Sequence, residues 1–237
     1  MPVVKGDFIL IEYTTRIKET GEVFDTTSME EAKKAGMFKE GAQYEPMLVV
    51  VGEVWVLKSL DDSLVGLEVG KESVVEIPPG QGFGERDPAK IRMIPLTRFR
   101  RQDIRPYPGA QIDVDGRPAV VRSVGAGRVQ VDFNPPLAGK TLIYNLTVKS
   151  TIADPMDKVK ALIHRRIPSI STEKFKITLN EVEAVIEVPE EAFNLEGIQA
   201  SKRGVASDLQ KFLPQIGKAT FTESFSKPKP TEPPASP

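Results

Sequence analysis

The feature that most constrains the fold is a short predicted helix inside residues 46–84, flanked by apolar and glycine-rich segments. Its apolar side chains recur every four residues, which places three of them on one face: Val56, Leu60 and Leu64. A stripe on so short a helix must face a core or a cavity. We expect the other side of the helix, Asp61 to Ser63, to be solvated.

The segments around this helix indicate a pocket. An apolar run, Met47 to Val51, precedes the helix, and glycines then turn the chain into a predicted strand that ends near Ile77. Phe83 follows in a loop, between two glycines. An aromatic side chain on a glycine-rich loop, beside a helix with an apolar face, is typical of a shallow apolar pocket rather than a polar active site.

Composition excludes several kinds of chemistry. The 237 residues suit two compact domains, by a rough guide of about 150 residues each. The net charge of −1 argues against a dedicated nucleic-acid binder. The absence of cysteine excludes disulfides and thiolate metal sites, and His164 is the single histidine. We therefore expect no metal and no cofactor.

The chain also lacks the marks of a membrane or secreted protein. Its first fifteen residues contain no apolar core of a signal peptide, and no apolar run approaches the ~18 residues of a membrane span. The sequence predicts a cytoplasmic protein without membrane contact.

The first 45 residues predict a β-hairpin followed by a helix. Apolar side chains alternate within residues 5–17 in the manner of a buried strand. Glu19 to Glu22 forms a hairpin turn, and the second strand contains Val23 and Phe24. Asp25, which closes that strand, is a local cap in one interpretation and a pocket residue in another. Residues 29–35 are a predicted helix.

Placed in order, these segments resemble the FKBP-type peptidyl-prolyl isomerases, most closely their SlyD-like and long archaeal branch. The resemblance covers roughly residues 3–150. It rests on Tyr13, GEVFDTT, VGEVWVLKSLDDSLVGLEVGKE, PPGQGFGERDP and PLAGKTLIYNLTV. The implied fold class is α+β, with a twisted antiparallel sheet wrapped on a short helix.

The resemblance also implies a site. The residues with a catalytic part in the family map to Tyr13, Phe24, Asp25, Leu57, Phe83 and Tyr144. Further pocket-lining, substrate-binding positions map to Met47, Val56 and Leu60. Leu60 would form the floor, where the family often has a tryptophan, and the backbone N–H of Leu57 would hold the substrate carbonyl. For Phe24 and Tyr144, plain core packing is the competing interpretation.

Residues 86–133 differ in charge from what precedes them. Residues 85–134 contain ten basic and six acidic side chains, whereas residues 1–84 contain eight and fifteen. Short strands are predicted at 110–114, 117–123 and 129–133. In the SlyD-like branch a domain inserted here, in the flap over the pocket, binds unfolded chains, so the resemblance implies an insert-in-flap chaperone domain.

Within this insert we expect a core and a binding surface. A unit of about 50 residues needs most of its apolar residues for its own core, and Val120, Val129 and Val131 are predicted there. Four others are expected to form an exposed substrate-binding surface: Met93, Ile94, Phe99 and Tyr107.

An RNA-binding barrel is the alternative for the insert. Four arginines, together with Phe99 and Tyr107, form a basic patch that contains aromatic residues. The arginines are Arg98, Arg100, Arg101 and Arg105. The protein would then be a non-catalytic chaperone or an RNA-associated factor on an inactive isomerase body. Surface arginines that serve solubility alone explain the same residues.

The remaining chain predicts a third part. The isomerase domain occupies residues 1–85 and 134–150, with a last strand through Leu142, Tyr144 and Leu146. Residues 151–226 follow an α-β-β-α-β pattern, with a helix that begins at Pro155. They contain no catalytic constellation, which favours a scaffold or a homodimer contact. Residues 227–237 contain five prolines and are predicted to be a disordered tail.

The sequence thus predicts a peptidyl-prolyl isomerase with holdase-type chaperone activity. Its partners would be unfolded or proline-containing protein chains, and nucleic acid is not expected among them in this interpretation.

Overall fold

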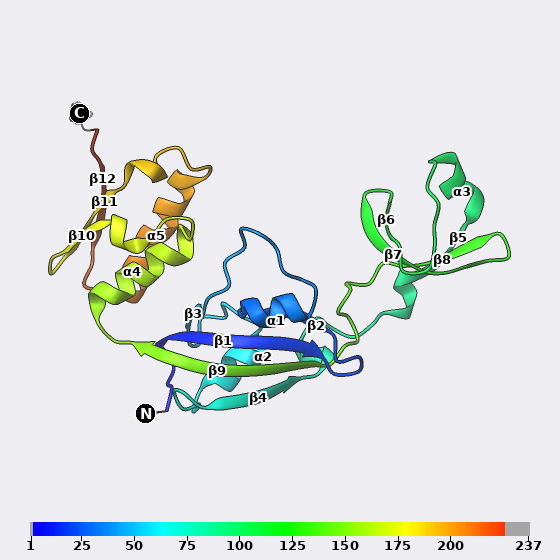
Figure 1. Ribbon diagram of the computed structural model, residues 1–237, viewed down its shortest axis with the longest axis horizontal. Coiled ribbons are helices and arrows are strands. Elements are labelled where there is room, and N and C mark those ends of the chain that lie inside the picture. Colours follow the sequence, from blue (N-terminus) through cyan, green and yellow to red (C-terminus); the bar gives the residue numbers. More distant parts are fainter. Residues whose placement is uncertain (1, 226–237) are drawn as a thin grey trace, which may run out of the picture. The chain divides into compact units, whose positions relative to one another are not determined.

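A computed structural model describes residues 2–225 of the chain (Figure 1). The described chain divides into two compact units. One contains residues 2–6 and Ile11–Lys149, and the other contains Asp7–Leu10 and residues 150–225. The architecture is α+β, as predicted, with antiparallel strand pairs and a few short helices. The predicted tail, 227–237, lies outside the described residues.

The first unit is built on a five-stranded sheet of order β2-β1-β9-β4, with β3 paired to β1. The strands are β1 (Phe8–Ile17), β2 (Val23–Thr26), β3 (Met47–Val50), β4 (Glu72–Ile77) and β9 (Leu142–Ile152). The β1/β2 and β4/β9 pairs are antiparallel. The chain leaves the sheet after β4 and returns at β9. Two neighbouring strands are therefore separated by the whole insert.

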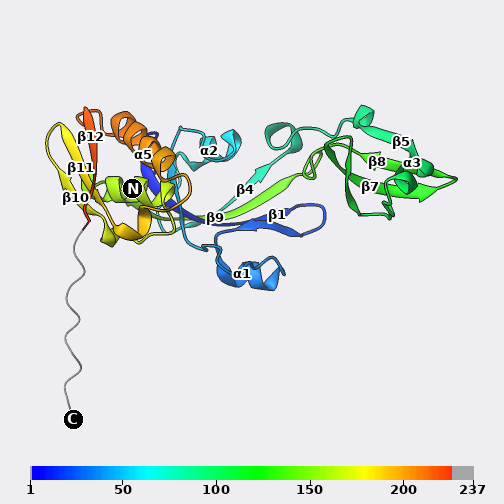
Figure 2. The same ribbon diagram turned by 90° about the horizontal axis from the view of Figure 1, so that it is seen from above.

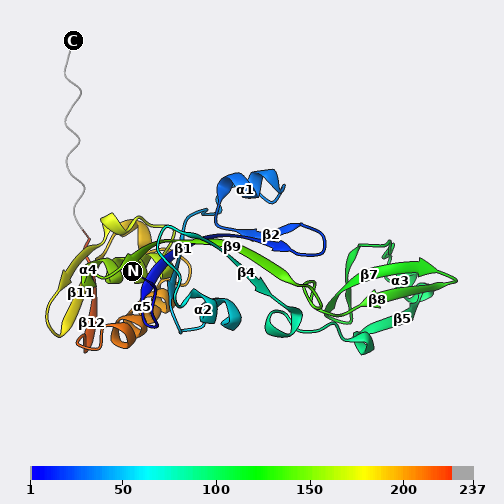
Figure 3. The same ribbon diagram turned by 90° about the horizontal axis from the view of Figure 1, so that it is seen from below.

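Two short helices accompany this sheet, α1 (Met29–Lys34) and α2 (Lys58–Leu64). Figures 2 and 3 show them on opposite sides of it. Leu60 and Leu64 of α2 are fully buried, so the predicted apolar stripe is confirmed within the helix. Val56 precedes the first helical turn and is half-buried.

The prediction of a solvated face is wrong for Asp61, whose exposed fraction is 1%. Its carboxylate accepts hydrogen bonds from the backbone N–H groups of Gly52 (3.0 Å) and Val54 (2.9 Å). Val54 has a φ of 55°, a left-handed conformation that costs a β-branched residue about 1–2 kcal/mol. Asp61 therefore holds a strained loop against the side of the helix that the sequence pattern assigned to solvent.

The insert forms a separate four-stranded antiparallel sheet of order β5-β8-β7-β6. Its strands are β5 (Ile91–Pro95), β6 (Gln111–Val114), β7 (Arg117–Gly125) and β8 (Arg128–Asp132), with helix α3 (Leu96–Arg101) between β5 and β6. The three predicted strands are confirmed. The sequence pattern did not predict β5 and α3.

Two residues expected on the insert's surface form its core instead. Ile94 is 8% and Phe99 1% exposed, and both belong to a cluster with Val129 and Val131. The prediction that these two side chains are exposed is wrong, because they pack into the insert's own core, against which Leu96, Ile104, Ile112 and Phe133 also pack. Met93 and Tyr107 are exposed, as predicted. Val129 and Val131 are confirmed as core, whereas Val120 is only half-buried.

A polar network joins the two chain segments that enter and leave the insert. The buried carboxylate of Asp132 accepts hydrogen bonds from the backbone N–H (2.9 Å) and side-chain amide (2.8 Å) of Asn134, and it forms ion pairs with Arg86 and Arg122. Asn134 in turn bonds the backbone N–H and carbonyl of Asp87, both at 2.9 Å. The segment that enters the insert and the segment that leaves it are therefore joined by hydrogen bonds between the side chain of Asn134 and the backbone of Asp87.

The second unit has a three-stranded sheet of order β10-β11-β12. Its elements are α4 (Pro155–Arg166), β10 (Lys176–Leu179), β11 (Glu183–Val188), α5 (Ile198–Phe212) and β12 (Lys218–Glu223), which confirms the predicted α-β-β-α-β order. The side chain of Asp154 caps α4, with Pro155 in its first turn. Phe8 packs edge-on against Phe212, with ring centroids 5.5 Å apart, which explains why Asp7–Leu10 belong to this unit.

No helix within residues 2–225 has the length and apolar character that a membrane crossing requires.

Candidate active site

Tyr13, Asp25 and Tyr144 lie close together on the adjacent strands β1, β2 and β9. The hydroxyl of Tyr13 on β1 donates a hydrogen bond to the carboxylate of Asp25 on β2, at 2.8 Å. The ring of Tyr13 lies 5.8 Å from that of Tyr144 on β9. The antiparallel β1/β2 register, in which Thr15 faces Asp25, places Asp25 near Tyr13, and the pairing of β1 with β9 brings Tyr144 in from a distant part of the sequence.

Phe24 and Phe83 form a second contact of the same region. Their rings meet edge to face, with centroids 6.4 Å apart. Phe83 lies in the loop after β4, between Gly82 and Gly84, and is 42% exposed. Gly84 has a φ of 85° and its carbonyl accepts the N–H of Gly139, so the turn behind Phe83 requires glycine and is anchored near β9.

Helix α2 and its N-cap position supply two of the remaining predicted pocket residues. Leu60 is buried, and Leu57 stands at the N-cap position, where no side chain caps the helix. The N–H groups of a first helical turn lack intrahelical partners, so this end offers donors to a bound carbonyl. The hydroxyl of Ser59 donates to the carbonyl of Gln81 at 2.9 Å, which fixes the Phe83 loop to the start of the helix.

The predicted site residues range from buried to exposed, as the residues of an open pocket do. Leu60 and Tyr144 are buried. Intermediate exposure is found for Tyr13, Phe24, Val56 and Leu57. Asp25, Met47 and Phe83 are exposed. A buried floor with an exposed rim fits an extended segment of polypeptide that enters from solvent.

Both tyrosines remain protonated near neutral pH. Burial raises the pKa of Tyr13, and the neighbouring Asp25 carboxylate raises it further. Burial is also the main cause of the raised pKa of Tyr144, with Asp25 again contributing. Each hydroxyl is thus a hydrogen-bond donor rather than an acid or base in the neutral range.

The residues that sequence reasoning missed act through loop contacts. Asp61 fixes the loop before α2, and Ser59 fixes the loop that carries Phe83. Both interactions depend on how distant loops fold back on the helix, so no local spacing announces them. Within residues 2–225, no three His, Cys, Asp or Glu side chains are grouped so that they could hold a metal ion.

Comparison with known proteins identifies the family. Residues 1–98 match the FKBP-type peptidyl-prolyl cis-trans isomerase family, residues 92–137 match the FKBP26 IF domain, and residues 155–226 match the FKBP26 C-terminal domain. A short-type peptidyl-prolyl cis-trans isomerase of Methanocaldococcus jannaschii is 35% identical over 147 residues, which are 62% of this chain and 92% of the relative. The chain belongs to the FKBP-type peptidyl-prolyl isomerase family.

Two further relatives of this FKBP-type isomerase match more than half of the chain. The SlyD isomerase of Treponema pallidum is 28% identical over 173 residues, 71% of this chain and 89% of the relative. The FKBP-type 16 kDa isomerase of Escherichia coli K12 is 26% identical over 151 residues, 62% of this chain and 91% of the relative. The enzyme is therefore a SlyD-like FKBP-type isomerase that acts on proline-containing protein substrates.

Proposed function

We propose that this isomerase acts on unfolded or partly folded protein chains, and that its insert holds those chains while the body isomerises their Xaa-Pro bonds. The observation that carries the proposal is the combination, within one chain, of an aromatic cluster whose residues range from buried to exposed and an insert with its own sheet and with exposed Met93 and Tyr107. Cytoplasmic location and an archaeal source are part of this proposal.

The proposed chemistry requires no acid or base. Rotation about an Xaa-Pro amide is slow because the planar bond is resonance-stabilised, with a barrier of about 18–20 kcal/mol. Twisting the bond removes the resonance and its charge separation. An apolar wall of Phe24, Leu60 and Phe83 therefore favours the twisted amide over the planar one. An acceleration of about 10⁵-fold needs only ~7 kcal/mol of such preference.

Polar groups at the rim would orient the substrate. We assign the uncapped N–H of Leu57 to the carbonyl of the substrate. Tyr13, held by Asp25, has its hydroxyl fixed at the edge of the aromatic cluster. Tyr144 and Val56 would line the sides, and Met47 the exposed rim. These assignments follow the family resemblance, and the exposure of each residue agrees with them.

The insert would supply holding power that the pocket lacks. A pocket for one proline and its neighbour makes few contacts, so an unfolded chain dissociates quickly. A second apolar surface on the same molecule raises the local concentration of proline sites without any new chemistry. We assign this surface to Met93 and Tyr107, because Ile94 and Phe99 are buried. The C-terminal unit is proposed as a homodimer contact.

The test compares two substrates of different size. We expect replacement of residues 87–132 by a short loop to leave turnover of a short Xaa-Pro peptide within about threefold, while proline-limited refolding of a whole protein slows more than about tenfold. Met93→Ser and Tyr107→Ser should reproduce part of the refolding defect. Equal losses on both substrates would contradict the proposal, because the insert would then shape the pocket.

A further inference from the structure

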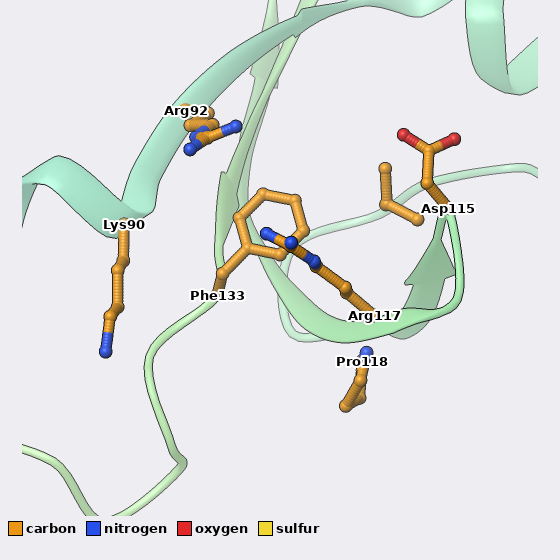
Figure 4. A pocket seen from close by; sticks show the side chains of 7 residues that line it. Lys90, Arg92, Asp115, Arg117, Pro118 and Phe133 are labelled. Carbon is orange, nitrogen blue, oxygen red and sulfur yellow. The ribbon is translucent and has the colours of Figure 1, made fainter.

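A cavity of about 590 Å³ in the insert carries three cations around an aromatic ring (Figure 4). Lys90 precedes β5, Arg92 lies within it, Arg117 begins β7, and Phe133 follows β8. The volume lies in the range of sites that bind small molecules or single side chains with their neighbours.

Strand alternation explains why the arginines line this cavity. Arg92 pairs with Val131 and stands two residues before Ile94, and both of these are buried. Arg117 stands two residues before the buried Ala119. Residues two apart on a strand share a face, so both arginines project from the core-facing side of the sheet, at an end where their heads remain exposed.

These three cations lack carboxylate partners. Within residues 2–225 no ion pair or side-chain hydrogen bond involves Lys90, Arg92 or Arg117. Among the other arginines of the insert, Arg98 pairs with Asp115 and Arg122 pairs with Asp132. The guanidinium of Arg92 lies over the ring of Phe133, 5.9 Å from its centroid. The cavity thus presents unneutralised donors beside an aromatic surface.

A second cavity, of about 350 Å³, adjoins the first and shares Pro118 and Phe133 with it. Its other lining includes Ile112, Ala119 and Pro136, so it is largely apolar. We propose that this paired site binds a client polypeptide segment in which a carboxylate stands next to an apolar side chain. The inference rests on the proposed holding function and names the segments that the insert selects.

The geometry favours such a peptide over nucleic acid. Asp115 also lies on the cavity wall, where its carboxylate is paired with Arg98 and its charge is offset. Phe133 is half-buried and covered by Arg92, which leaves little of its face for base stacking. The cations also surround one cavity, whereas a nucleic-acid backbone requires a track of them. A single carboxylate, held by a guanidinium pair, fits this arrangement better.

The experiment uses the full chain and two fluorescent, proline-free peptides that differ only by Glu or Gln beside a Phe. At low salt we expect the Glu peptide to bind at least ~5-fold more tightly in fluorescence anisotropy, as a charge-assisted contact allows. Arg92→Gln and Arg117→Gln should each reduce this preference to less than about twofold. Arg128→Gln, an exposed arginine at the other end of β8, should preserve it.

Three results would overturn the site. They are equal affinity for the two peptides, equal loss of preference in Arg128→Gln, and tighter binding of a labelled oligouridylate that Arg92→Gln abolishes. Suppression of the aggregation of an unfolded protein, measured in parallel, separates this inference from the holding function. Suppression with equal peptide affinities would refute the carboxylate site alone. A glutamate preference without suppression would support the site and refute the holding function.

Discussion

Tyr13 and Tyr144 determine the expected response of the enzyme to pH. Burial and the Asp25 carboxylate raise the pKa of Tyr13, and burial raises that of Tyr144, so both lose their protons only above the usual value of about 10. The single histidine, His164, lies on α4 in the other unit. We expect kcat/KM on a short Xaa-Pro peptide to stay nearly constant from about pH 6 to 8. A bell-shaped profile centred near pH 7 would contradict an uncharged mechanism.

Phe83 and Asp25 separate the apolar wall from the polar rim. Phe83→Ala removes the ring that meets Phe24, and we expect kcat/KM to fall more than about tenfold, or roughly 1.4 kcal/mol of transition-state stabilisation. Asp25→Asn keeps an acceptor for Tyr13, so a loss below about threefold is expected. Leu57→Asp should resemble Phe83→Ala. The reverse ranking, from the same peptide assay, would move catalysis to the rim.

Asp61 and Asp62 are adjacent on α2 but should differ in their contribution to stability. Asp61→Asn loses one of two backbone hydrogen-bond acceptors in a buried site, which costs about 1–3 kcal/mol of unfolding free energy. Asp62 is exposed and forms only a surface ion pair with Lys58, so Asp62→Asn should cost less than ~0.5 kcal/mol. Urea denaturation measures both. If Asp61→Asn costs as little unfolding free energy as Asp62→Asn, the strained loop needs no anchor.

At this scale the sequence predicted which side chains form the cluster better than which ones support it. The resemblance led to Tyr13, Phe24 and Phe83, and the structure brings them into two aromatic contacts. Asp61 was assigned to solvent because helical periodicity records the side of the helix but not the loop that folds onto it. Whether each residue acts in catalysis stays a prediction for the assays above.

Among the elements, the junction of the insert depends on one buried carboxylate. Asp132→Asn keeps the shape of the side chain but leaves Arg86 and Arg122 without their ionic partner. Both arginines are partly exposed, so we expect a loss of about 2 kcal/mol rather than the full cost of breaking a buried pair. Hydrogen exchange at residues 86–87 and 132–134 should accelerate. Asp103→Asn, at an exposed position of the insert, serves as control.

The strength of the sequence signal varied with the element. Strands β6, β7 and β8 are separated by glycine-containing turns at residues 115–116 and 126–127, so their sequence pattern sufficed although β7 has a bulge between Val121 and Ser123. Strand β5 (IRMIP) and helix α3 (LTRFRR) are five and six residues long and rich in arginine. Such short elements gain their stability from packing onto the sheet, here through Ile94 and Phe99, and local propensity alone cannot reveal that.

For the whole molecule, the short-type relative is shorter than this chain, since 92% of its length aligns with 62% of this chain. We expect a chain ending at Ile152, where β9 ends, to turn over a short peptide within about threefold of the full chain. Light scattering should show a smaller assembly if the C-terminal unit is a dimer contact. Loss of peptide turnover would mean that the sheet depends on this unit. The truncation also removes Phe212, which packs against the ring of Phe8. Phe8→Ser in the truncated chain controls for the exposure of that ring.

The return of the chain to its first sheet at β9 has a consequence for biosynthesis. A ribosome releases β1 and β4 long before their common neighbour β9, so the catalytic sheet stays open while the insert emerges. Within the insert, β6, β7 and β8 are joined by local hairpins and β5 pairs with β8, so this sheet can close as soon as β8 leaves the exit tunnel. Phe8 can form its ring contact only after Phe212 has been synthesised. We therefore expect the insert, with its proposed holding surface, to fold on the nascent chain before the catalytic sheet closes. The first unfolded segments that the insert can bind are then the unpaired strands of its own chain.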